Sequence, residues 1–301
     1  MKPHKDASGP QTGWHNLIRG RRLPFKLGVI ATLAIAIGAN IAVLGNLGVL
    51  FGPVVPGATH YRLLEPYLQP MALKSLSPSQ AGIPRPVYDA LAAALKGRAD
   101  VAFYEPDWGS FIIHGGQPHY MPYLITTASL TKVLGVHAIA GRMLNSGDSL
   151  AGSPPVIVIA ARLAKSEFSS AEAAVGKVLT FNGKDRTIVG VLPASLSFPT
   201  GIHTPAEAWV PIPPESSALI GTLQFIDQYA LVHTLVPLSQ AALKVSLADA
   251  YRQSLARYKS DEQHFLNSID TRMRVATLAE REFGPVLTRL KVLEIAAVLL
   301  L

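Results

Sequence analysis

The sequence predicts an α+β domain that lies outside a membrane and follows one N-terminal transmembrane helix. Three observations support this prediction. Residues 27–59 contain no Asp, Glu, Lys, Arg or His. Residues 58–284 alternate short runs of strand and helix periodicity with turns rich in glycine, proline and asparagine. Basic residues cluster before the uncharged run, and such a cluster sets the orientation of a helix in a membrane.

Composition and charge limit the class of protein. Of the 301 residues, 49% are hydrophobic and 16% are charged, whereas about 25% are charged in a typical soluble domain. This balance excludes a disordered chain and differs from that of an ordinary cytosolic enzyme. The chain has no cysteine, which excludes disulfides, thiolate metal ligands and thiol nucleophiles. The net charge is +7, but much of it belongs to residues 1–26, so we expect no nucleic-acid binding.

Residues 27–51 form the predicted transmembrane helix. A helix of this length reaches about 37 Å, which is enough to cross a hydrocarbon core of about 30 Å with some tilt. The alternatives are a cleaved signal peptide and a buried soluble helix, but the run is too long for the usual cleaved signal. The basic tail predicts that residues 1–26 are cytoplasmic and that the chain after Gly57 is outside the cell membrane, in the periplasm of a bacterial inner membrane. Within this tail, Trp14–Arg22 predicts a short helix at the interface with membrane lipids.

Small side chains at a spacing of four predict a packing stripe on this helix. Ala34, Gly38 and Ala42 lie on one face, and Asn40 is available to hydrogen-bond across a helix–helix contact. A helix that served only as an anchor would need no such stripe. We therefore expect another membrane helix to pack against these four candidate residues.

Residues 285–301 predict the start of a second, truncated transmembrane helix. Val292–Leu301 is apolar apart from Glu294 and is too short to span a bilayer. Because the chain stops within this apolar run, we expect the span to continue in a longer protein. The alternative is an amphipathic C-terminal helix that packs on the domain.

Between these segments, residues 58–284 predict a mixed set of helices and strands. Two helices are expected, at Pro86–Lys96 before Gly97 and at Arg162–Phe168, and a third is expected to begin at a Ser239 cap and to end at Tyr258. The expected strands are Ser110–His114, His119–Ala128, Pro154–Ala160, Val178–Phe181, Arg186–Leu192 and Thr271–Thr277. Asn182–Gly183 is the strongest hairpin signal, because both residues tolerate positive φ.

Four stretches in this order resemble the MacB/FtsX-like ABC permease family with its MacB-type periplasmic core. They are Ala31–Asn40 (ATLAIAIGAN), Leu134–Asp148 (LGVHAIAGRMLNSGD), Val175–Pro199 (VGKVLTFNGKDRTIVGVLPASLSFP) and Leu287–Leu301 (LTRLKVLEIAAVLLL). The family usually has four membrane helices, of which only the first and the start of the second are present here. Tyr229–Pro237 also departs from the family pattern, which has Arg-Leu-x-x-Gly in this region.

The resemblance implies a membrane permease subunit of an ABC-type transporter or mechanotransmission complex. Its implied partners are a cytoplasmic ABC ATPase, a second copy or a paired permease, and periplasmic adaptor proteins. The phosphate-binding pattern G-x-x-x-x-G-K-[ST] is missing from the sequence, so ATP is expected on the separate ATPase and no cofactor is expected here. An alternative function is a singly anchored periplasmic adaptor or binding module, which would lack downstream spans.

One short motif suggests an enzyme. Gly147–Leu150 spells the GDSL of an ester hydrolase family, and Asp261 and His264 match the spacing of its acid–base pair. In such enzymes the serine follows a buried strand, which holds its hydroxyl near the histidine. Here Arg142–Ser146 precedes the motif and reads as a polar loop. We therefore expect Ser149 to lie in a solvated loop of a protein that is not an enzyme, with no catalytic residue, and the scattered histidines predict no metal site.

Overall fold

The structure is a computed structural model. It describes residues 63–71, 81–113, 116–199, 204–213, 227–258, 260–268, 270–278 and 280–281, together with six positions between Gly28 and Gly38. The chain divides into one compact unit of residues 53–284 and another of residues 1–52 and 285–301. In the second unit the six described positions are helical, and the Thr32 hydroxyl donates to the Gly28 carbonyl at 2.8 Å.

Within the described part of the chain, no helix combines the length and the hydropathy needed to cross a membrane. The predicted interfacial helix in residues 1–26 lies outside the described residues, and so do most of residues 27–51 and all of residues 285–301.

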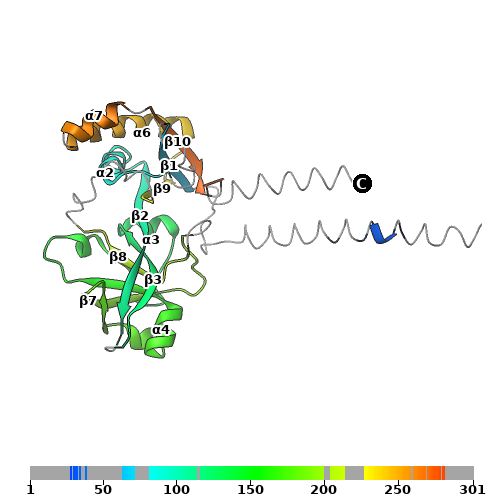
Figure 1. Cartoon of the computed structure of the whole chain (residues 1–301), viewed down its shortest axis with the longest axis vertical. Helices are drawn as coiled ribbons and strands as arrows, with labels where there is room; N and C mark the ends of the chain where they lie inside the picture. Colours follow the sequence, from blue (N-terminus) through cyan, green and yellow to red (C-terminus); the bar gives the residue numbers. More distant parts are fainter. Residues whose placement is uncertain are drawn as a thin grey trace, which may run out of the picture. The chain divides into compact units, whose positions relative to one another are not determined.

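The compact unit contains ten strands in a single sheet, with helices packed on it (Figure 1). The strands are β1 (Leu63–Pro70), β2 (Ala99–Ile112), β3 (His119–Thr126), β4 (Ala140–Gly141), β5 (Val156–Ala160), β6 (Val178–Phe181), β7 (Lys184–Leu192), β8 (Ala208–Pro211), β9 (Tyr229–Thr234) and β10 (Thr271–Thr277). The helices are α2 (Arg85–Ala94), α3 (Ser129–Leu134), α4 (Ala161–Phe168), α5 (Ala171–Ala174), α6 (Gln240–Ser254) and α7 (Ser260–Ser268), with 3₁₀ turns η2 (Ser146–Ser149) and η4 (Leu255–Arg257). The expected α+β class is confirmed.

The sheet has an open part and a closed part. Its order is β10-β1-β9-β2-β3-β8-β5-β7-β4, and β6 pairs with both β2 and β7. The pairings of β2, β3, β8, β5, β7 and β6 therefore close into a ring, whereas β10, β1 and β9 extend from β2 as an open antiparallel sheet. Two pairs in the ring are parallel, β3 with β8 and β5 with β7. Among the described residues, β10 is the free edge of the open part.

Three clusters of buried side chains form the core. The first lies on one face of the open part, beneath α2, α6 and α7, and includes Phe103, Leu243 and Leu247. The second packs α3 against the sheet and includes Trp209. The third joins the ring strands to α4 and α5. Figure 1 shows α2, α6 and α7 at the end of the domain that carries β1 and β10, and α4 at the other end.

Several predicted elements are present with shifted ends. The predicted hairpin is β6–β7, with φ of 47° at Asn182 and 72° at Gly183. The Ser239 hydroxyl caps α6 by accepting the Ala242 N–H at 3.1 Å. The predicted end of this helix at Tyr258 is wrong, because α6 ends at Ser254 and η4 follows as a tighter turn. The strand expected from Ser110 is also longer than predicted, since β2 begins at Ala99.

Candidate functional site

The first and last strands of the domain meet side by side at the free edge of the sheet. β1 pairs antiparallel with β10, and Leu64 lies opposite Thr277. The start of β1 and the end of β10 are therefore at the same end of the sheet. These are the two places where the chain leaves the domain toward residues 27–51 and 285–301, the predicted membrane segments. This junction is the candidate functional site.

A helix begins directly after β10. The Thr277 hydroxyl accepts the Glu280 N–H at 3.1 Å, and the Glu280 carboxylate accepts the Thr277 N–H at 2.8 Å. This reciprocal pair is a capping box, which satisfies two N–H groups that otherwise have no partner at a helix start. Leu278, Glu280 and Arg281 are helical. The cap thus fixes the point at which strand becomes helix.

A buried ion pair connects this helix to β1. Arg281 Nε donates to a Glu65 carboxylate oxygen at 2.9 Å, and a terminal guanidinium nitrogen lies 2.8 Å from the same oxygen. The Arg281 and Glu65 side chains are 5% and 3% exposed. Arg281 also donates to the Ala81 carbonyl. One side chain therefore joins the helix after β10, the strand β1 and the segment before α2, across more than 200 residues of sequence.

Aromatic rings enclose the guanidinium. Its central carbon lies 4.1 Å from the centre of the Tyr67 ring and 5.8 Å from the Tyr229 ring, which are distances of cation–π contacts. Tyr229 in turn stacks on Tyr104, with the ring centres 5.2 Å apart. Burial raises the pKa of Tyr229, so the phenol is neutral and adds no charge beside the pair. The pair is thus anchored to β1 and β9 by packing as well as by charge.

Burial and charge act in opposite directions on Glu65. Burial raises the pKa of Glu65, and the neighbouring Arg281 guanidinium opposes that rise. Burial lowers the pKa of Arg281, but the attraction of Glu65 outweighs this and leaves the pKa of Arg281 raised. Arg281 therefore remains charged, and its only buried counter-charge among the described residues is Glu65. Removing either partner would leave a buried charge or a buried acid without its partner, and such a loss is strongly destabilising.

The Ala81 carbonyl is held in place by a close backbone contact. The Ile83 N–H donates to the Gln228 carbonyl at 2.6 Å, and the Leu68 N–H donates to the Gly82 carbonyl at 2.8 Å. A Cβ atom on Gly82 would lie 1.9 Å from the Gln228 carbonyl oxygen. Glycine is therefore required at this position, because any side chain would push β9 away from the segment that receives Arg281.

Nothing in this arrangement resembles a catalytic site. It holds an arginine, a glutamate and tyrosines that are fully engaged with one another, and no nucleophile lies beside a base. What it provides is a stiff connection between the two ends of the domain. The chemistry of the junction therefore supports transmission of movement between the chain ends.

The residues predicted for helix packing are only partly described. Ala34 and Gly38 lie on described helical positions and are exposed, whereas Asn40 and Ala42 lie outside the described residues. Their role in packing against another helix stays a prediction.

The GDSL stretch forms a structural turn. Asp148 accepts two hydrogen bonds from the Arg142 guanidinium, at 2.7 and 2.8 Å, and Asn145 and Asp148 form a capping box at the start of η2. Burial raises the pKa of Asp148, but the bonds from Arg142 and Asn145 outweigh burial and hold it below the ordinary value. The predicted loop is thus a capped 3₁₀ turn, and its acid is already occupied.

Ser149 and His264 do not form a pair. The chain beside η2 packs into the second cluster through Leu144, whereas α7 packs into the first cluster through Leu266. His264 is exposed on α7. The GDSL stretch and its matching histidine therefore belong to different parts of the core.

Sequence reasoning missed Glu65 and Arg281. One local signal was available, because Thr277-Leu278-Ala279-Glu280 has the spacing of a capping box and predicts a helix start after the last strand. Nothing local connects Glu65 to Arg281. Their pairing depends on β1 and β10 being neighbours, which a single sequence does not specify.

The fold and this junction define an α+β domain whose two ends leave together from one edge of the sheet. Residues 27–256 match the family of MacB-like periplasmic core domains. The chain belongs to this family. The resemblance to MacB/FtsX-like permeases and the MacB-type fold are thereby confirmed.

Solved structures show the same architecture at low identity. A domain of a protein described as a permease from Porphyromonas gingivalis is 16% identical, with a TM-score of 0.51, and the match covers 74% of this chain and 91% of that one. The periplasmic region of MacB from Actinobacillus actinomycetemcomitans is 14% identical, with a TM-score of 0.48 and coverage of 75% and 94%. The extracellular domain of the noncanonic ABC-type transporter YknZ from Gram-positive bacteria is 16% identical, with a TM-score of 0.46 and coverage of 70% and 99%. No curated protein matches the chain.

Proposed function

We propose that the chain is the membrane permease subunit, or part of it, of an ABC-type complex that couples a separate cytoplasmic ATPase to the domain of residues 58–284 outside the membrane. The observation that carries this proposal is the junction of β1 and β10. Both chain ends leave the domain at one sheet edge, and the Glu65–Arg281 pair ties them together. The family of MacB-like periplasmic core domains supports the permease assignment.

The junction suggests how movement would pass into the domain. If residues 27–51 and 285–301 are the flanks of two spans, a displacement of one span would load β1 or β10 first. β1 and β10 are paired from Leu64–Thr277 to Pro70–Thr271, and the ion pair lies at the end near the chain exits. A packed and paired junction of this kind moves as a unit rather than deforming gradually. The load would then reach α6 and α2, which pack over the same strands.

The proposal includes partners and location. The ATPase would contact the cytoplasmic residues 1–26, and a second copy or a paired permease would pack on the stripe of Ala34, Gly38, Asn40 and Ala42. Adaptor proteins would bind the outer domain. ATP would be bound by the ATPase subunit, so the chain itself would need no cofactor and would not be an enzyme.

Co-purification tests this proposal. The chain extended by its native downstream sequence is expressed with the neighbouring ATPase gene product, and the complex is isolated from membranes. We expect the ATPase to co-purify with the wild-type chain and to be lost with Gly38→Leu, because the larger side chain would separate the packed helices. Ser149→Ala is the matched control and should retain the ATPase. If the wild-type chain recovers no ATPase, the permease assignment is wrong and the singly anchored adaptor takes its place.

A further inference from the structure

The outer edge of β10 borders an open groove. The groove has a volume of about 590 Å³ and is lined by four residues of α6 and four of β10: Ala241, Lys244, Val245, Ala248, Thr271, Arg272, Met273 and Arg274. Within the described part of the chain, β1 is the only strand paired with β10. An antiparallel strand directs half of its N–H and C=O groups away from its partner, so these groups of β10 face the groove side without a strand to receive them.

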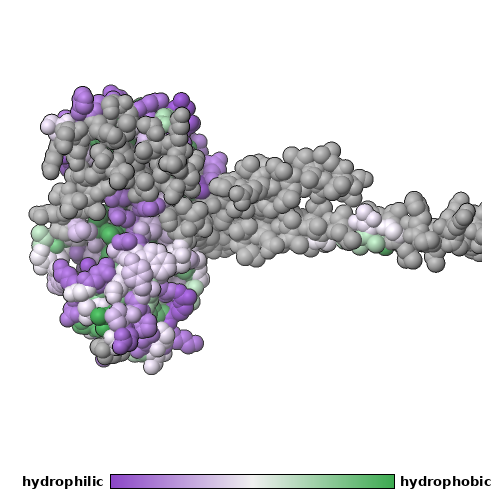
Figure 2. Space-filling model, viewed as in Figure 1, coloured by the Kyte–Doolittle hydropathy of each residue, from purple (hydrophilic) through white to green (hydrophobic). Residues whose placement is uncertain are grey.

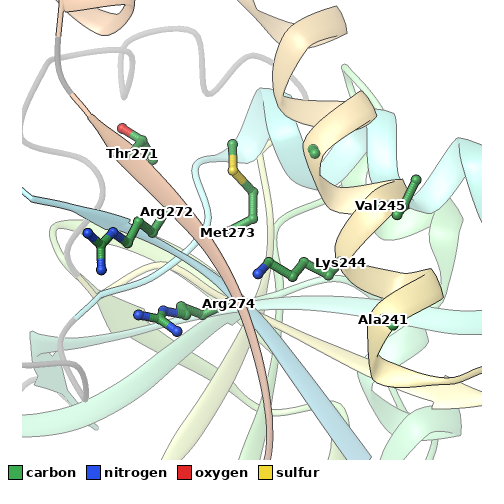
Figure 3. Close-up of a pocket in the computed structure, with 8 residues that line it drawn as sticks. Ala241, Lys244, Val245, Thr271, Arg272, Met273 and Arg274 are labelled. Carbon is green, nitrogen blue, oxygen red and sulfur yellow. The ribbon is translucent and has the colours of Figure 1, made fainter.

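The two faces of β10 differ in chemistry. Figure 3 shows Met273 and Lys244 between the strand and α6, and Arg272 and Arg274 projecting from the other side of β10. This alternation follows from the strand period, which places Arg272 and Arg274 on the face away from the first core cluster. Figure 2 shows mainly hydrophilic described residues at the end of the domain that carries α6 and β10.

The groove is cationic and lacks counter-charges. Lys244, Arg272 and Arg274 make no ion pair with any described residue, and none of the eight lining residues is acidic. The side of α6 that faces outward presents Ala241, Val245 and Ala248, and Val245 is 63% exposed. These small side chains leave room for apolar groups beside the strand edge.

We propose that β10 is a docking edge for an extended acidic segment of a partner protein, which adds to the sheet as a further strand. In this arrangement alternate side chains of the segment point to the two faces of the sheet. Acidic side chains on one face lie beside Arg272 and Arg274. Small apolar side chains on the other face lie beside Met273, Val245 and Ala248. The partner segment therefore alternates acidic and apolar residues over about seven positions, the length of β10.

Charge also decides against a second copy of this chain as the occupant. Edge-to-edge pairing of two β10 strands would place the basic residues of one copy against those of the other, and like charges across strands are destabilising. Basic residues on an edge strand commonly prevent such self-association. The same residues favour an acidic partner.

Peptide binding tests the proposal directly. The full chain is reconstituted in nanodiscs, and the probe is a fluorescent nine-residue peptide that alternates Glu and Val. A peptide of the same composition with the Glu and Val residues in separate blocks is the control. Anisotropy should show the alternating peptide binding at least about tenfold more tightly than the blocked one, with affinity falling as salt rises.

Backbone methylation distinguishes strand addition from simple charge attraction. Two further peptides carry N-methyl groups on every second residue, one at odd and one at even positions. Only one of these sets of N–H groups faces β10, so one peptide should lose about tenfold or more in affinity and the other should keep its affinity. If both methylated peptides bind as tightly as the parent, or if both lose binding equally, the strand-addition proposal is wrong.

Charge variants test the named residues. Arg272→Glu/Arg274→Glu should reduce binding of the alternating peptide at least about tenfold, and the milder Arg272→Gln/Arg274→Gln should give a smaller loss with an unchanged fold. Lys177→Glu/Lys184→Glu on exposed residues of the ring should leave binding unchanged. Equal binding by all three variants would overturn the proposal. The inference rests on the proposed function only in placing the partner outside the membrane, and peptide binding can fail while ATPase co-purification succeeds.

Discussion

At the scale of single residues, Glu65 and Arg281 carry the central structural argument. Both side chains are almost fully buried, and each satisfies the other. Such a pair adds little net stability compared with apolar side chains of similar size, but breaking it is costly. Its value therefore lies in fixing one geometry at the point where the two chain ends meet.

A double-mutant cycle tests this pair. Glu65→Gln should lower the free energy of unfolding by about 3–5 kcal/mol, because Arg281 would keep a buried charge without a counter-charge. Glu65→Leu/Arg281→Met should restore most of this loss. Urea unfolding of the extended chain in nanodiscs, followed by tryptophan fluorescence, provides the measurement. Equal stability of Glu65→Gln and the wild type would show that the pair is not buried in solution.

The pH dependence of Arg281→Met follows from the same pair. Without the guanidinium, nothing opposes the effect of burial, so the pKa of Glu65 should rise further above its ordinary value. The folded state would then hold a proton that the unfolded state has released. Stability should therefore fall as the pH rises from the ordinary glutamate pKa through the raised one. Unfolding midpoints from pH 4 to about 8 test this, and a variant that gains stability over this range would contradict it.

Asp148 and Ser149 make a second contrast between neighbours. Asp148→Asn should cost about 1–2 kcal/mol, because it weakens both the Arg142 pair and the cap of η2. Ser149→Ala should change stability by less than about 0.5 kcal/mol and leave any phenotype intact. Thermal unfolding separates the two. An esterase activity that disappears with Ser149→Ala alone would reverse our reading of the GDSL stretch.

At the scale of elements, the capping box after β10 determines where the strand ends and the helix begins. Thr277→Ala should destabilise the domain by about 1 kcal/mol, because the Glu280 N–H loses its partner. Thr277→Ser keeps the hydroxyl and should change stability by only a few tenths of that amount. Amide hydrogen exchange of residues 278–281 reports the cap locally. Identical protection in Thr277→Ala and wild type would show that the box does not hold the helix start.

The elements that sequence predicted well are those with local causes. The Ser239 cap, the Asn182–Gly183 turn and β10 each depend on residues a few positions apart, and all three are present. β1 was not predicted, because Glu65, Pro66 and Pro70 interrupt its apolar pattern, and its burial comes from neighbours distant in sequence.

Long-range pairing explains what sequence could not supply. β9 lies at the centre of the open sheet between β1 and β2, but its sequence alone departed from the family pattern without explanation. The closure of the ring through β6 and the contact of Glu65 with Arg281 depend on strand neighbours of the same kind. A resemblance to a family gave the fold class, whereas the junction and the groove required coordinates.

At the scale of the whole molecule, the distribution of charge makes a prediction about orientation. A reporter fused after residue 60 should be active only on the outer side of the membrane, because the basic residues of the tail precede the apolar run. Replacing the six basic residues of the tail by acids should weaken or mix the orientation. Paired alkaline phosphatase and fluorescent-protein fusions measure it, and activity of the wild-type fusion in the cytoplasm would contradict it.

The central claim is that β1 and β10 carry movement from the membrane segments into the domain. Hydrogen exchange of the complete permease–ATPase complex, compared between nucleotide-free and ATP-trapped states, tests it most directly. We expect amide exchange to change in β1, β10 and residues 278–281, with β5 of the ring as an unchanged internal reference. Glu65→Leu/Arg281→Met should keep the fold and the bound ATPase but lose this response. Exchange that is identical in both nucleotide states throughout residues 63–281 of the wild-type complex would contradict the claim.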